Sequence, residues 1–288
     1  MSQVALRSRP RRRRAGGWRT VASTAVWLVI AFNLAVFAWL FINSLRSHAE
    51  IFANPWGLPN VLHTENWVNA WTTSGFGAAI GNSVLVCVTS AVGIVLLSAP
   101  AGYILAKTNR RLSEVALMYI AVGVGVPMQV IVIPLFTIVQ TLGLLNSLFG
   151  LIVVYIALNL PFSVFLLAGF FRSMPDELEE AAALDGAGML RIFAQIIAPM
   201  ARSGMTTALI LNLVWLWAEV FLALILIQST EKQTLPLALL NFMAQQQYGG
   251  NDYGQLLAGI GIILLPVLAA YIWLGRRIIE GMTVGAGK

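Results

Sequence analysis

No charged residue occurs between Glu114 and Arg172. Soluble domains rarely contain so long an uncharged stretch, because about a quarter of their residues are charged. A bilayer-crossing helix needs only ~20 apolar residues, so this stretch is too long for one crossing. The turn-forming residues after Gly143 divide it and predict spans at about 115–138 and 148–171. With 58% hydrophobic residues overall, the sequence predicts an all-α polytopic membrane protein.

Four further apolar runs complete a predicted domain of six transmembrane helices, residues 21–278. These runs lie at about 21–43, 80–106, 203–227 and 254–275. The first run is longer than the core of a signal peptide, so we expect it to be retained as a span. A basic tail, residues 1–20, precedes the domain, and a short tail, residues 279–288, follows it.

The positive charges predict the orientation of these spans. Six spans place both termini on one side, and the positive-inside rule makes that side the cytoplasm. Only Arg46 and Lys232, of the 18 Lys and Arg residues, then lie outside. The positive-inside rule explains the net charge of +6, so we expect no nucleic-acid partner. Cys87 is the only cysteine, so no internal disulfide is possible.

One long polar segment, residues 173–200, interrupts the apolar second half of the chain between the predicted spans four and five. Pro175 and the acidic residues after it predict a helix start, because the positive end of the helix dipole favours negative charge. Gly186 and Gly188 predict its end, at left-handed or closely approached positions. A second helix should then stop at Pro199. We expect two helices joined by a glycine break, facing the cytoplasm.

The spacing in this segment resembles the EAA loop of ABC importer membrane subunits. The matching residues are Glu180, Ala181, Ala182, Gly186, Ile196 and Pro199, and Ala198 stands where the family has Leu. The resemblance implies that the loop couples a separate ATPase to the spans. It implies a polar contact for Glu180, a close-packing surface for Ala181 and Ala182, a brace for Asp185 and the turn for Gly186. For Glu177 and Glu179, a merely solvated acidic face is an alternative.

Further segments resemble the second permease subunit of carbohydrate ABC importers, the group that contains the maltose permeases. They are Asn43-Ser44-Leu45-Arg46, Glu65-Asn66-Trp67, Ile133-Pro134-Leu135 and Thr283-Val284-Gly285-Ala286. The resemblance implies a multi-pass permease in the plasma (inner) membrane of a bacterium, translocating a carbohydrate or polyol. Its implied partners are a second permease subunit, two ATPase subunits and an extracytoplasmic solute-binding protein. It implies no cofactor in this chain, with ATP and Mg on the partner ATPase.

The substrate pathway has three candidate residues in the fifth predicted span. Glu219 is the only ionisable residue within it, and a charge at that depth costs at least ~2.5 kcal/mol, so it should face a cavity or a partner. Trp215 and Trp217 can stack on a sugar ring, although interfacial anchoring is the commoner role of such a pair. The family has Trp, Asn and an acidic residue where this chain has Trp217-Ala218-Glu219. Any contact that the family makes through this Asn therefore does not carry over to Ala218.

Two other functional classes are weighed against this one. A self-sufficient secondary transporter would ordinarily carry several coupling-ion acids in discontinuous helices and a repeated architecture. The predicted spans contain one acid, Glu219, and the sequence shows no evident repeat. A membrane-embedded hydrolase would need a nucleophile or a metal dyad at membrane depth. The tail Gly285-Ala286-Gly287-Lys288 lacks the first glycine and the Ser or Thr of a phosphate-binding loop. The sequence therefore favours a permease that depends on a partner ATPase.

Overall fold

The computed structural model describes residues 16–108, 110–249 and 252–286, and their regular secondary structure is helical. Most of the predicted basic tail, and the last two residues of the chain, lie outside the described residues. The first helices are α1 Gly16–Asn43, α2 His48–Ala53, α3 Glu65–Thr73, α4 Phe76–Lys107, α5 Arg110–Val124, α6 Met128–Thr141 and α7 Leu148–Arg172. Then come α8 Glu177–Leu184, α9 Met189–Ile192, a π-helical turn Phe193–Ile197, α10 Ala198–Met200, α11 Arg202–Ala218, α12 Phe221–Leu226, a 3-10 turn Thr230–Lys232, α13 Leu235–Gly249 and α14 Tyr253–Ala286.

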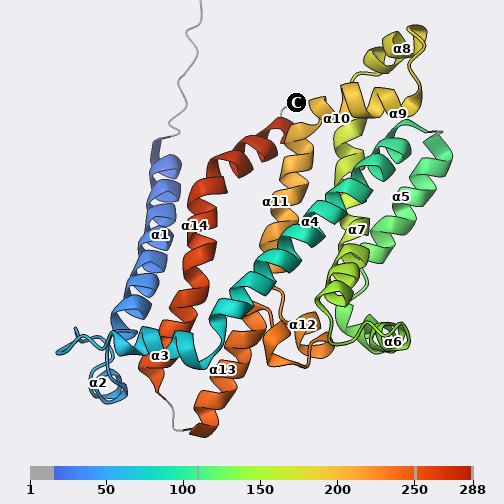
Figure 1. The fold of residues 1–288 in the computed structure, drawn as a ribbon. Helices are drawn as coiled ribbons and strands as arrows, with labels where there is room; N and C mark the ends of the chain where they lie inside the picture. The colour runs from blue at the N-terminus through green and yellow to red at the C-terminus, as the bar shows by residue number, and fades with distance from the viewer. Residues whose placement is uncertain (1–15, 109, 250–251, 287–288) are drawn as a thin grey trace, which may run out of the picture.

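The long helices run between two ends of the molecule (Figure 1). One end carries α8, α9 and α10, and we call it the elbow end. The opposite end carries α2, α3, α6, α12 and α13. The start of α1 and the end of α14 both lie at the elbow end.

Within the part of the chain that the structure describes, three helices are long and apolar enough to cross a membrane: residues Thr20–Asn43, Phe76–Lys107 and Leu148–Arg172. They coincide with the first, second and fourth predicted spans. The number rises to five if the bent pairs α5–α6 and Met189–Ala218 each count as one span.

The third predicted span is not one straight helix. α5 ends at Val124, α6 begins at Met128, and the two helices meet at 94°. Pro127 lies at this break with an extended backbone, ψ 131°. Proline has no N–H and disfavours helix in the residue before it, which explains why the apolar run bends here.

The fifth predicted span also differs. α11 ends at Ala218, Glu219 and Val220 are not helical, and α12 adds only a short helix up to Leu226. The break falls within an apolar run, where hydropathy gives no sign of it.

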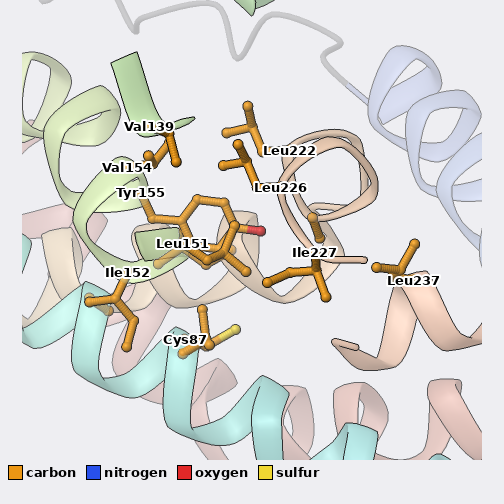
Figure 2. Close-up of a cluster of buried hydrophobic side chains, with 14 of the residues drawn as sticks. Cys87, Val139, Leu151, Ile152, Val154, Tyr155, Leu222, Leu226, Ile227 and Leu237 are labelled. Carbon is orange, nitrogen blue, oxygen red and sulfur yellow. The ribbon is translucent and has the colours of Figure 1, made fainter. Parts of the chain in front are cut away.

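The core lies between α4 and α7, where the two helices approach closely. A Cβ on Gly102 would lie 3.0 Å from the backbone nitrogen of Ala168, so a larger residue would need the two helices to separate by a few tenths of an ångström. Nearer the opposite end, side chains from α4, α6, α7, α12 and α13 meet around Tyr155 (Figure 2). They include Cys87, Val139, Leu151, Ile152, Val154, Leu222, Leu226, Ile227 and Leu237. By contrast, most of α1 is exposed and none of its most apolar window is buried.

Candidate functional site

The polar segment folds into an elbow of two helices, α8 and the helix Met189–Met200, which is made of α9, the π-helical turn and α10. Its first helix begins at Glu177. Ser173 belongs to the end of α7, where its hydroxyl donates to the carbonyl of Phe170. Gly186 has φ +78°, as the sequence predicts, whereas Gly188 has φ −72° and needs no special freedom.

The turn at Gly186 has the hydrogen bonds of a Schellman motif. The Gly186 N–H donates to Ala183 O and the Ala187 N–H to Ala182 O, each at 3.0 Å. The Asp185 side chain makes no hydrogen bond to the described residues, so the turn is closed by backbone alone. A Cβ on Gly186 would meet nothing within 4 Å, so only its backbone conformation demands glycine.

The inner face of the elbow packs against the chain's own helices. Ala182, Ile192 and Ile197 are buried in a cluster with residues of α4, α7 and α11. The ring of Tyr103 lies 5.8 Å from that of Phe171 within this cluster. Of the two alanines expected to contact a partner, Ala182 is therefore covered by this chain, and Ala181 alone is exposed.

The outer face of the elbow is apolar and exposed. Leu184 is 90% exposed and Leu190 85% exposed, with Met189, Ala181, Glu180 and Asp185 exposed around them. Leucines so fully exposed on α8 and α9, which lie at the elbow end of the molecule (Figure 1), are typical of a surface that contacts another protein. We call Ala181, Leu184, Met189 and Leu190 the elbow patch.

A set of charged and polar contacts joins α8 to the end of α4. Lys107, whose side chain is only 10% exposed, forms an ion pair with Asp176 and another at 3.1 Å with Glu179 Oε1. Its Nζ also donates to Met174 O at 3.2 Å. The Tyr103 hydroxyl donates to Glu179 Oε2 at 3.0 Å. Glu179 is therefore not a solvated surface acid, and no local pattern reveals partners so distant in sequence.

Pro199 lies inside the last turn of the elbow rather than at its end. Without an N–H, Pro199 cannot bond the carbonyl of Gln195, and the preceding residues form a π-helical turn in which Ala198 N–H bonds Phe193 O. The helix ends at Met200, and the chain turns by 75° into α11. Ile196 is half-buried against the inner-face cluster.

Glu219 is buried, 8% exposed, at the break between α11 and α12. Its carboxylate accepts hydrogen bonds from the Tyr155 hydroxyl at 2.5 Å and from the backbone N–H groups of Leu222 at 2.8 Å and Ala223 at 3.4 Å. These N–H groups are the unpaired donors at the start of α12. Glu219 therefore caps a helix and faces the packed core, where the sequence suggested a cavity or a partner.

Trp215 lines a cavity of about 430 Å³ near the α5–α6 bend, whereas Trp217 and Glu219 do not line it. Asn159 and Asn212 also line it, and the sequence analysis missed both. Their amide nitrogens donate within the bundle, to Tyr155 O and to Ser163 Oγ, while their amide oxygens make no hydrogen bond to the described residues. The cavity thus combines an indole ring with two free acceptors.

Comparison with known proteins identifies the class. Residues 98–283 match the family described as binding-protein-dependent transport system inner membrane component. The chain is 37% identical to the diacetylchitobiose uptake system permease protein NgcG of Streptomyces coelicolor, over 90% of this chain and 85% of that protein. It is 32% identical to the trehalose transport system permease protein SugB of Mycobacterium tuberculosis, over 96% and 98%.

A solved structure has the same fold. It belongs to a bacterial ABC transporter involved in the import of the acidic polysaccharide alginate, with a TM-score of 0.72 and 23% identity. The match covers 90% of this chain and 96% of that chain.

Proposed function

This chain belongs to the family of binding-protein-dependent transport system inner membrane components, and from that membership we propose that it moves a carbohydrate or polyol across the membrane. The transported class is supported by relatives named for diacetylchitobiose, for trehalose and for multiple sugars. Alternating access, driven by ATP hydrolysis on a partner, is the mechanism proposed for this transport.

The elbow patch is the proposed docking surface for the ATPase. The observation that carries this assignment is the pair Leu184 and Leu190, almost fully exposed at an end of the molecule that also holds both described termini. Removing two such side chains from water on docking favours association, at about 25 cal/mol for each Å² buried. Glu180 and Asp185 beside the patch supply polar contacts at its rim.

Six crossings with both termini in the cytoplasm are the proposed topology. α1, α4, α5, α7, α11 and α14 pass in turn between the elbow end and the opposite end (Figure 1). In this topology the α5–α6 pair is one broken crossing, and α12 lies near the outer surface. The positive-inside rule then assigns the elbow to the cytoplasm, since Arg172, Arg191 and Arg202 flank it.

The cavity beside Trp215 is the proposed part of the substrate pathway. Free amide oxygens accept hydrogen bonds from sugar hydroxyls, and an indole face packs against the C–H face of a sugar ring. Its volume of about 430 Å³ lies within the range of small-molecule sites. Glu219 is not part of this proposed pathway, because its carboxylate lies in the core and caps α12.

The proposed assembly contains a second permease, two ATPase subunits and an extracytoplasmic solute-binding protein. The exposed apolar sides of α1 and α5 leave surface for lipid and for the second permease. A self-sufficient secondary transporter is disfavoured, because the acid of the fifth predicted span is bonded to Tyr155 and to α12 and is not free to bind a coupling ion.

Purifying the full chain in mild detergent tests this function. We expect an ATPase subunit and a second permease to co-purify with it. Recovery of the chain alone, combined with ion-driven sugar uptake by that chain, would overturn the proposal.

A further inference from the structure

The end of α4 is fastened to the elbow at a position far from the covalent connection between them. Lys107 is the last residue of α4, and its ammonium contacts Asp176, Glu179 and the carbonyl of Met174. Tyr103, one turn earlier, donates to the other carboxylate oxygen of Glu179. We call Tyr103, Lys107, Asp176 and Glu179 the α4–α8 tether.

The tether is partly shielded from water. The Lys107 and Glu179 side chains are only 10% and 19% exposed, although Asp176 is 77% exposed. Contacts to charged groups are stronger than those between neutral ones, and salt screens partly buried pairs less than exposed pairs. Glu179 Oε1 forms an ion pair with Lys107 but accepts no hydrogen bond. It has no other partner among the described residues. Loss of the ammonium would leave this buried oxygen uncompensated.

The tether complements the apolar contact beneath the elbow. Ala182 and Phe193 pack against α4 and α7, but a smooth apolar contact permits one helix to slide along another. An ammonium held between three oxygen atoms, with a hydroxyl on the same carboxylate, fixes the position of α8 along α4.

The segment of α4 that carries the tether lies beyond a proline. Pro100 is inside α4, and its missing N–H leaves the carbonyl of Leu96 without the usual helical bond. The two turns from Ala101 to Lys107 are therefore the part of α4 that can tilt against the remainder most readily.

From these observations we propose that Lys107 is a positioning residue for coupling: it makes the last two turns of α4 move with α8. The proposal rests on the function proposed above, since it requires an ATPase that displaces the elbow. Movement of α8 then reaches α4 directly, in addition to α7 and α11, to which the elbow is joined through the chain. Because α4 packs along α7 and α11, its tilt alters the centre of the bundle.

Lys107→Gln and Lys107→Arg test the proposal in the complete importer, reconstituted in vesicles with its ATPase and binding protein. The readout is the number of trehalose or diacetylchitobiose molecules taken up for each ATP hydrolysed. We expect Lys107→Gln to lower this ratio roughly fivefold or more, because it removes a charge-assisted contact, and Lys107→Arg to restore most of it. ATPase co-purification should be unchanged, because Lys107 lies outside the elbow patch.

Arg172→Gln is the matched control, since Arg172 is exposed and bonds only Ser113 Oγ at 3.3 Å among the described residues. Its uptake ratio should equal that of the parent. If Lys107→Gln does not accumulate in the membrane, Glu179→Gln replaces it and should lower the ratio in the same way.

If Lys107→Gln takes up as many sugar molecules for each ATP hydrolysed as the parent does, the proposed role of Lys107 is wrong. The same holds for Glu179→Gln where that variant replaces it. Equal loss in Lys107→Arg and Lys107→Gln overturns this role as well. Failure of the proposed function is distinguishable, because the parent chain would then bind no ATPase and neither sugar would stimulate ATP hydrolysis.

Discussion

The Tyr155 hydroxyl on α7 donates to Glu219 Oε2 at 2.5 Å, which ties α7 to the break between α11 and α12. The other carboxylate oxygen accepts the Leu222 N–H at 2.8 Å. This buried pair serves the fold. It explains how an ionisable side chain is accommodated in an apolar segment without lining the cavity beside Trp215.

We therefore expect Glu219→Gln to destabilise the chain and to leave its sugar preference unchanged. Gln keeps the volume of Glu, but it has one acceptor oxygen where Glu219 has two, so at least one of these three donors loses its acceptor, at a cost of about 1–3 kcal/mol. Tyr155→Phe should have a smaller effect, because the helix cap remains. Thermal unfolding in detergent measures the first effect, and competition between sugars for uptake measures the second. A changed preference at unchanged thermal stability would return Glu219 to the substrate pathway.

Trp215→Ala should weaken transport of the sugar without lowering the stability of the protein. Loss of the indole wall of the cavity should raise the apparent KM for uptake by about tenfold, the equivalent of one ring contact of ~1.4 kcal/mol. Trp71→Ala is the control, since Trp71 is similarly exposed but lies on α3. Equal KM values in the parent and Trp215→Ala would remove this cavity from the pathway.

Leu184→Asp should abolish ATPase docking. A carboxylate at the centre of the elbow patch would be desolvated on contact, and central interface residues commonly contribute about 2 kcal/mol or more. The amount of ATPase that co-purifies measures the effect. Leu58→Asp places the same change on an exposed residue of the loop between α2 and α3 and should have none. Normal ATPase recovery with Leu184→Asp would show that the docking surface lies elsewhere.

Single cysteines test the orientation. Cys87 is buried in the core, so Cys87→Ser provides a background without an accessible thiol. A cysteine introduced at Leu58 should react with an impermeant maleimide in intact cells, and one at Leu184 should react only after permeabilisation. Labelling of the Leu184 position from outside would contradict both the topology and the docking surface.

Local signals in the sequence predicted those parts of the structure that depend on neighbouring residues. Uncharged runs of sufficient length coincide with α1, α4 and α7, because crossing a bilayer imposes a minimum apolar length. Gly186 was predicted at a turn because a positive φ favours glycine strongly. The Schellman bonds at this glycine need only backbone groups, so they follow from the same local rule.

Contacts between distant segments were not predictable in this way. Hydropathy does not register a bend, so the break after Ala218 was missed. The break after Val124 has a local signal, because Pro127 has no N–H and favours a kink there. Lys107 finds its acids about 70 residues further along the chain, and no spacing rule connects them. Glu219 was expected to face a cavity or a partner, because a charge at membrane depth is costly. Its hydrogen-bond partner Tyr155 lies on another helix, and the sequence does not reveal that contact.

In the proposed mechanism the elbow couples ATP hydrolysis to transport, and Gly186→Val tests this role. Valine at φ +78° strains the backbone by at least ~1 kcal/mol, which favours a different angle between α8 and α9, while a Cβ there meets nothing within 4 Å. Gly186→Asn is the control, because Asn tolerates the left-handed region best after glycine.

The measurement is sugar uptake together with sugar-stimulated ATP hydrolysis in vesicles that contain the complete importer. We expect Gly186→Val to insert normally but to lose ATPase association or the stimulation of ATP hydrolysis by sugar, and we expect Gly186→Asn to retain both. Parental ATPase binding and a parental uptake rate in Gly186→Val would contradict this role of the elbow.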